Sequence, residues 1–214
     1  MIYLVKIEQM KKTLSIILVQ SALILIFMGL FAWEGSASEG NVIVKTQGGN
    51  LIVTPYTPNI ISIVLSETER VNNTDAVFLS PQHLSFKTEQ VNGKITITTD
   101  SLSIVIDNNT SGIQFFDLKN NLIASESGFF TDSIYSGFRF NLVNNEMIFG
   151  GGEGAIPINR RGYRLNLNNE PHWGYGWGEE NLNYSVPHFI SSSNYSVFFD
   201  NGAIGYADIG KRNP

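Results

Sequence analysis

The sequence predicts an all-β protein, an antiparallel β-sandwich that follows an N-terminal hydrophobic segment. From residue 42 onward, apolar residues recur with the period of two that is typical of strands, not with the helical period of 3.6. The apolar runs are short, and Gly, Asn and Pro residues separate them at intervals of roughly ten residues. The chain of 214 residues contains 20 glycines, 14 phenylalanines and 8 tyrosines, a composition that suits strands and tight turns.

Residues 1–37 are predicted to be a signal peptide or, if they are not cleaved, a membrane anchor. Met10 is followed by two lysines, by the charge-free apolar run Thr13–Trp33, and by the small residues Gly35–Ala37. Cleavage is expected after Ala37 or Ser38, but the apolar run is also long enough to cross a bilayer. Residues 38–214 are then an exported domain, periplasmic or extracellular. The alternative that the apolar segment anchors this domain to the membrane stays open.

The strands can be assigned in order along this exported domain. Asn92-Gly93 offers the positive φ angles of a type I′ turn, and alternating Ile and Thr residues follow it from Ile95. The other predicted strands are Val42–Thr46, Leu51–Pro55, Ile60–Leu65, Leu102–Asp107, Ile113–Asp117, Asn121–Ser125, Phe138–Leu142, His188–Ser192, Tyr195–Asp200 and Ile204–Gly210.

Composition argues against several classes of function. The net charge is −5 and only 15% of residues are charged, which disfavours nucleic acid as a partner. The chain has no cysteine, so it can form neither disulfides nor a lipid-anchored N-terminal cysteine. The histidines His83, His172 and His188 do not have the spacing of metal ligands, and we expect no metal and no cofactor. Of the three, His172 lies among aromatic residues and is a possible ligand contact.

Gly150, Gly152 and Ala155 match a dinucleotide-binding pattern on paper. That mechanism needs a helix to follow, and the sequence places Pro157 and no helical period there. We therefore expect these glycines to form a tight turn between strands.

The sequence shows no signature of nucleophilic catalysis, since no serine is marked out by a base and an orienting acid. Glu153, Glu170, Glu179 and Glu180 are carboxylates of the type that glycoside hydrolysis requires. Nothing in the sequence identifies an acid and a nucleophile among them.

The segment Asn168–Glu180 is rich in aromatic residues. Trp173, Tyr175 and Trp177 alternate with glycines, beside Asn and Glu residues. Such rings stack on the C–H faces of sugars while amides and carboxylates bind hydroxyl groups. The alternative is that the rings pack on the sandwich or on another domain, and composition alone does not decide between the two.

The segment Phe149–Gly210 resembles glycoside hydrolase family 31, which includes α-glucosidases, α-xylosidases and 4-α-glucosyltransferases. The matching motifs are GGGE, INRRGYR, an N-x-acid triplet and YSVPHFISS. The resemblance implies a galactose-mutarotase-like N-terminal sandwich, which in the family precedes a (β/α)8 barrel with the catalytic Asp nucleophile and Asp acid/base. Residues 38–214 would then lack the barrel and all catalytic residues, and the chain alone would be inactive.

The resemblance also implies a substrate contact. The family loop that reaches over the barrel often uses the Asp of an N-x-D triplet, and the matching triplet here is Asn168-Asn169-Glu170. Glu170 and Asn168 are therefore predicted to bind substrate, an α-glucan or malto-oligosaccharide, although Glu replaces the usual Asp. Trp173 and Tyr175 are added on the stacking argument above. Arg160 and Arg161 are interpreted as structural.

Within the family, the sequence looks most like the exported α-glucosidase and 4-α-glucosyltransferase branch, whose full enzymes retain configuration. A non-catalytic carbohydrate-binding or interaction module is the alternative. A stand-alone epimerase would need a Glu base paired with a His acid, and no such pair is recognisable. A sandwich without its barrel is also expected to expose an apolar surface.

Overall fold

A computed structural model describes residues 36–38, 40–68, 84–131, 134–170, 173–180, 182–200 and 202–212. The chain divides into two compact units, residues 1–36 and 37–214, and the second contains the fold. The signal or anchor predicted for residues 1–37 lies outside the described residues except for its last two, which belong to a strand. Within the described ranges, no helix has the length and apolarity that a membrane crossing requires.

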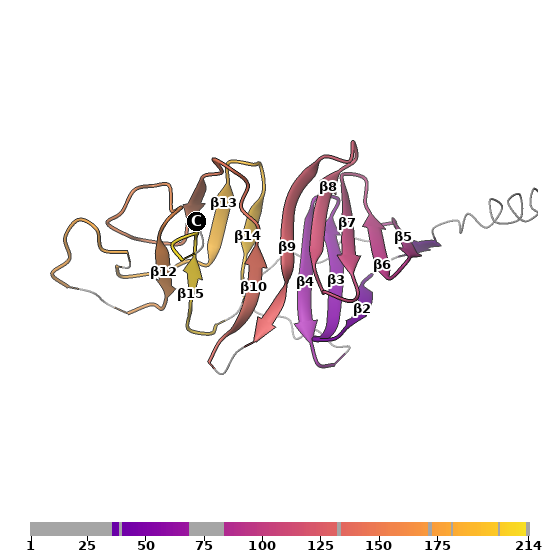
Figure 1. Ribbon diagram of the computed structural model, residues 1–214, viewed down its shortest axis with the longest axis horizontal. Coiled ribbons are helices and arrows are strands. Elements are labelled where there is room, and N and C mark those ends of the chain that lie inside the picture. Colours follow the sequence, from indigo (N-terminus) through magenta and orange to yellow (C-terminus); the bar gives the residue numbers. More distant parts are fainter. Residues whose placement is uncertain are drawn as a thin grey trace, which may run out of the picture. The chain divides into compact units, whose positions relative to one another are not determined.

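The largest element is a seven-stranded sheet (Figure 1). Its neighbouring strands from β5 to β10 pair antiparallel. In spatial order the strands are β1 (Ser36–Ser38), β5 (Phe86–Val91), β6 (Lys94–Thr98), β7 (Leu102–Asp107), β8 (Ile113–Asp117), β9 (Leu122–Thr131) and β10 (Ser136–Phe140).

A three-stranded antiparallel sheet packs on the large sheet. It consists of β2 (Val42–Thr46), β3 (Gly49–Thr57) and β4 (Ile60–Ser66). Alternate residues of the two sheets face each other, and the aliphatic side chains on these faces are removed from water, which is the main source of stability of a sandwich. This first core contains Val44, Leu51, Val53, Phe86, Ile95, Ile97, Ile104, Ile106 and Ile113.

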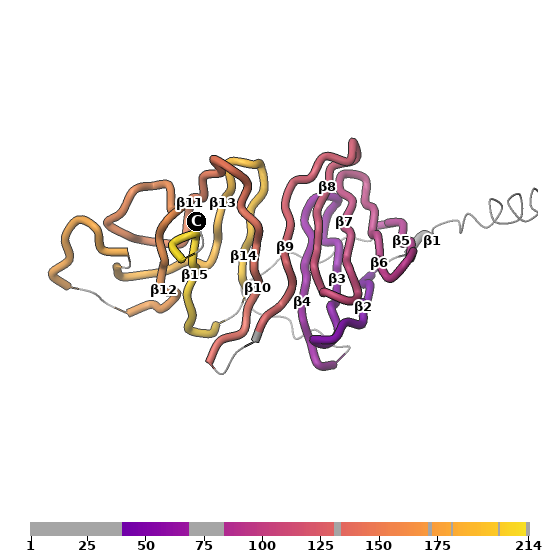
Figure 2. The backbone as a smooth tube through the Cα atoms, in the orientation of Figure 1, coloured from indigo at the N-terminus to yellow at the C-terminus, as the bar shows by residue number. Residues whose placement is uncertain are grey.

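A second core lies in the C-terminal half. One sheet there has the order β11 (Ile148–Gly150), β13 (His188–Ser191), β14 (Ser196–Phe198). The other is a two-stranded ribbon of β12 (Arg164–Leu167) and β15 (Gly205–Asp208), which lie side by side in Figure 2. The buried residues of this second core are Ile148, Ile156, Leu165, Phe189 and Ile209.

The predicted all-β sandwich is confirmed, and β2, β7 and β8 have the predicted bounds. The predicted type I′ turn is also present, with φ of 50° at Asn92 and 75° at Gly93. The strands β1, β5, β11 and β12 were not predicted. β11 is three residues long and ends in glycine, and β12 has only two apolar residues, so neither of these two forms a recognisable apolar run.

The glycines Gly150, Gly151 and Gly152 all have positive φ. A Cβ atom on Gly150 would lie 2.2 Å from the carbonyl oxygen of His188, and one on Gly152 would lie 2.6 Å from Cα of Ser185. The backbone therefore leaves β11 in close contact with the segment that leads into β13. No helix follows these glycines within the described chain, so the nucleotide-binding pattern lacks its structural context.

Candidate functional site

The ribbon β12–β15 has one face toward the second core and one face toward solvent. Leu165 is buried on the core side. Because side chains alternate along a strand, Arg164 and Asn166 lie on the opposite face. Asn166 pairs with Tyr206 of β15, which places the Tyr206 side chain on the same outer face. This polar face forms the floor of a cavity.

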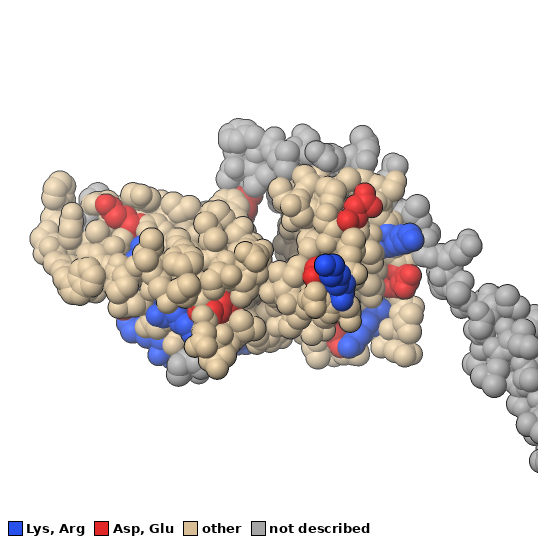
Figure 3. All heavy atoms as spheres, turned by 90° about the horizontal axis from the view of Figure 1, so that it is seen from above, with Lys and Arg blue, Asp and Glu red and all other residues tan. Residues whose placement is uncertain are grey.

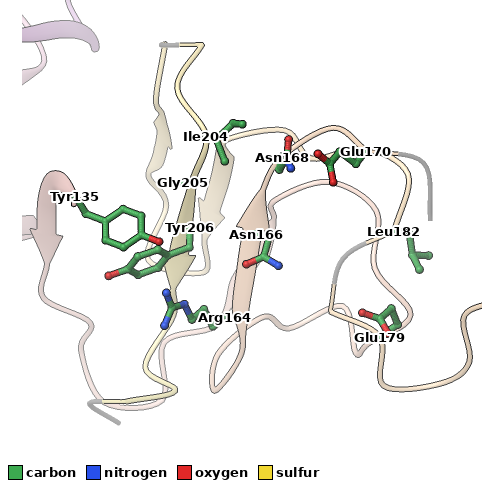
Figure 4. Close-up of a pocket in the computed structure, with 10 residues that line it drawn as sticks. All are labelled: Tyr135, Arg164, Asn166, Asn168, Glu170, Glu179, Leu182, Ile204, Gly205 and Tyr206. Carbon is green, nitrogen blue, oxygen red and sulfur yellow. The ribbon is translucent and has the colours of Figure 1, made fainter.

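The cavity has a volume of about 350 Å³ (Figure 4). Its walls come from the ribbon, from the loop after β12, and from the segment that precedes β10. The lining residues are Tyr135, Arg164, Asn166, Asn168, Glu170, Glu179, Leu182, Ile204, Gly205 and Tyr206.

Aromatic and cationic side chains form one wall of the cavity. The rings of Tyr135 and Tyr206 meet edge to face, with centroids 4.9 Å apart. Cζ of Arg164 lies 3.6 Å from the centroid of the Tyr206 ring, which is a cation–π stack. In Figure 4 these three side chains lie together at one end, with Glu170 and Glu179 toward the other.

The loop after β12 is held firmly at its base. Oδ1 of Asn169 accepts hydrogen bonds from the amide of Ser185 at 2.6 Å and from its hydroxyl at 3.1 Å. Glu153 accepts from the amide and side chain of Asn183. The bonds of Asn169 attach the backbone between the cavity-lining residues Asn168 and Glu170 to the segment around Ser185.

The aromatic residues of the same loop lie elsewhere. Trp173 is 88% exposed and Trp177 is 83% exposed, and Tyr175 is also largely exposed. None of the three lines the cavity. The structure therefore brings together two of the four predicted site residues, Asn168 and Glu170, and places Trp173 and Tyr175 outside the cavity. His172 lies outside the described residues.

The sequence reading missed Tyr135, Arg164, Asn166 and Tyr206 as cavity residues. A local signal was available for two of them. Residues 164–168 read Arg-Leu-Asn-Leu-Asn, so polar and apolar residues alternate, and the last Asn belongs to the predicted site. The two tyrosines come from distant segments, and only the fold brings them to this wall.

Two arginines near the site have structural roles, as predicted. Arg160 is only 8% exposed and donates hydrogen bonds to the carbonyl oxygens of Gly150, Gly152, Ile156 and Pro157. Its burial lowers the pKa of its guanidinium group. Arg161 donates to the carbonyl oxygens of Val143 and Glu146. Both side chains tie loops to the second core.

Two buried carboxylates lie away from the cavity. Glu146 accepts hydrogen bonds from the hydroxyl of Ser191 and from the amide of Val143. Glu126 is 4% exposed, and its Oε1 accepts a bond of 2.7 Å from the amide of Gly128. Its Oε2 accepts no hydrogen bond of good geometry, although the backbone N–H of Arg139 acts on the carboxylate, and burial outweighs both N–H groups and raises the pKa of Glu126 to about 7. Neither group reaches the cavity, so we assign both to the scaffold.

The described residues contain no group of three metal-ligating side chains close enough to hold an ion. The ring of His188 meets Phe198 edge to face and does not line the cavity. Most of the surface visible in Figure 3 is uncharged. The arrangement can bind a polar ligand through amides, carboxylates and a guanidinium group beside aromatic rings.

Comparison with known proteins agrees with this description. Residues 50–208 match the family of glycosyl hydrolase 31 N-terminal galactose mutarotase-like domains. No curated protein matches the chain at the level of sequence.

Several solved structures share the fold. A GH31 dextranase of Flavobacterium johnsoniae, complexed with glucose, is 24% identical with a TM-score of 0.68, over 84% of this chain and 24% of its own. The same enzyme with isomaltotriose is 25% identical with the same TM-score, over 83% of this chain and 24% of its own. The cycloalternan-forming enzyme of Listeria monocytogenes, with a pentasaccharide substrate, is 17% identical with a TM-score of 0.65, over 84% and 18% of the two chains.

This chain thus spans about a quarter or less of the length of these structures. The family match covers most of the chain, and the sheets are those of an antiparallel sandwich. The chain belongs to the family of glycosyl hydrolase 31 N-terminal galactose mutarotase-like domains.

Proposed function

We propose that this domain contacts the carbohydrate substrate of an exported enzyme that hydrolyses or transfers α-linked glucosyl residues. The cavity lined by Asn168 and Glu170 is the observation that carries the proposal. Amide and carboxylate groups beside aromatic rings are the groups that sugar-binding sites use. The similar dextranase is complexed with glucose and isomaltotriose, which supports an α-glucan or malto-oligosaccharide as the ligand.

The chemistry would take place outside this domain. The family resemblance assigns the Asp nucleophile and the Asp acid/base to a (β/α)8 barrel, and the full enzyme would retain configuration through a glycosyl-enzyme intermediate. An exposed apolar surface supports such a partner domain. On the face of the β11–β13–β14 sheet that is opposite the second core, Met147, Ile190 and Phe198 are all more than 40% exposed.

Two measurements on the purified chain test this function. We expect weak binding of maltotriose in NMR titrations, with dissociation constants in the millimolar range, and loss of binding in Glu170→Ala. We expect no release of nitrophenol from an aryl α-glucoside. Hydrolysis that disappears in Glu170→Ala would refute the assignment of catalysis to another domain.

A free-standing carbohydrate-binding module is the second candidate. It is favoured by the presence of amide, carboxylate and guanidinium groups in one cavity of this domain. Such a module should bind malto-oligosaccharides at micromolar concentration without any partner domain. Millimolar affinity would favour the first proposal.

Export is part of the first proposal and rests on the sequence of residues 1–37. Fractionation of cells that express the chain with a C-terminal tag should place it in the periplasm or medium. N-terminal sequencing of that material would distinguish a cleaved signal peptide from a retained membrane anchor.

A further inference from the structure

Three arginines occur within five residues, and two of them donate hydrogen bonds to other described residues. Arg160 and Arg161 donate to backbone carbonyl oxygens, as described above. Arg164 lies on the outer face of β12 and lines the cavity. Among the described residues, its guanidinium group makes no hydrogen bond and no ion pair. It stacks on the ring of Tyr206.

The orientation of Arg164 is nevertheless restricted. The stack at 3.6 Å holds the guanidinium plane against the Tyr206 ring, and the edge-to-face contact with Tyr135 holds that ring in turn. Stacking occupies the face of a guanidinium group and leaves the N–H donors along its edge available. A guanidinium group that is held in one orientation, with N–H donors available, can bind hydrogen-bond acceptors on a ligand.

The charges around the cavity restrict what this ligand can be. Arg164 is the cation of the lining, whereas Glu170 and Glu179 are carboxylates, so the lining has an excess of one negative charge. An anionic ligand would meet these two carboxylates and would be repelled. A neutral sugar would not, because its hydroxyl groups can accept from the guanidinium group and donate to the carboxylates.

We propose that Arg164 determines the orientation of the sugar in the cavity by donating two N–H bonds to a pair of adjacent oxygen atoms on a neutral pyranose. Tyr206 and Tyr135 act as positioning residues that hold the guanidinium plane. This inference rests on the proposed function, since it names the ligand contact and the charge class of the ligand at the same cavity.

The test is an NMR titration of the 214-residue chain with maltotriose, with glucose and with glucuronate. Arg164→Lys keeps the charge but not the planar fork, and should weaken maltotriose binding roughly tenfold. Tyr206→Leu keeps the donors but removes the stack, and should weaken binding severalfold. Arg139→Lys is the matched control, because Arg139 also stacks on a ring, that of Phe130 at 4.0 Å, but does not line the cavity. It should bind as the wild type does.

A double-mutant cycle then identifies the bond itself. Derivatives of methyl α-glucoside that each lack one hydroxyl group are titrated against the wild type and against Arg164→Lys. Removal of either of two adjacent hydroxyl groups should weaken binding to the wild type but have little further effect on binding to Arg164→Lys. Wild-type affinity in Arg164→Lys, with normal sugar binding, would overturn this inference and leave the proposed function intact. Tighter binding of glucuronate than of glucose would also overturn it. If no sugar binds the wild type, the proposed function itself fails, and the inference with it.

Discussion

Replacing Glu126 with glutamine should remove a loss of stability that the wild-type protein undergoes as the pH rises from 4.5 to 8. The side chain is buried, one oxygen accepts no hydrogen bond of good geometry, and its pKa is raised from 4.5 to about 7 because burial penalises the charged form. Because the pKa of Glu126 is higher in the folded state than in the unfolded state, ionisation of this group lowers the free energy of unfolding. This loss of stability is absent below pH 4.5. The loss grows as the pH rises and is complete above about pH 7.

The magnitude follows from this difference in pKa. At 1.36 kcal/mol for each pKa unit, ionisation of Glu126 lowers the free energy of unfolding by about 3 kcal/mol between pH 4.5 and pH 8. Glutamine cannot ionise, and its Oε1 can still accept from the amide of Gly128. The free energy of unfolding of the variant relative to that of the wild type should therefore rise by about 2–3 kcal/mol between pH 4.5 and pH 8.

Urea denaturation followed by far-ultraviolet circular dichroism at four pH values between 4.5 and 8 measures this difference. Glu89→Gln is the control, because Glu89 is exposed on β5, and the difference between this variant and the wild type should stay small at every pH. The quantity to compare is the difference between each variant and the wild type, since other groups titrate in the same range. If that difference for Glu126→Gln does not change with pH, the reasoning is refuted.

Three further outcomes can be measured in thermal unfolding and in the binding assay. Gly150→Ala should destabilise the fold by about 2–4 kcal/mol because its φ is +100° and the added Cβ meets a carbonyl oxygen, whereas Gly176→Ala, with open space around it, should cost under about 1 kcal/mol. Arg160→Met should lower the free energy of unfolding by about 3 kcal/mol, because buried carbonyl oxygens lose their donor; an unchanged melting temperature would contradict this. Trp177→Ala should change stability by less than about 0.5 kcal/mol, and a larger loss would show that the ring packs on the domain.

The strands were predictable where local chemistry was strong. β7 alternates half-buried and buried residues from Ser103 to Asp107, and the Asn-Gly turn before β6 requires positive φ angles. β9 extends to Thr131, well beyond the predicted Ser125. The glycine at position 128 interrupts the apolar pattern, and antiparallel pairing with the next strand, β10, overrides that local signal.

The candidate site was predictable only in part. The resemblance pointed to Asn168 and Glu170, and both line the cavity. The opposite wall depends on Tyr135 and Tyr206, which are about seventy residues apart in the sequence and meet only in the folded chain. The exposed positions of Trp173 and Tyr175 could not be inferred from composition, because the same residues would suit either a cavity wall or a projecting loop.

The loop between Trp173 and Gly178 differs from the ribbon in how much change it can tolerate. Three of its glycines have open space around them, and two of its rings project into solvent, so few neighbours constrain its sequence. β12 is different, because its side chains alternate between the core and the cavity. The tip of the loop could therefore be exchanged for another sequence at little cost in stability, whereas most substitutions in the strand that carries Arg164 and Asn166 would disturb the core or the cavity.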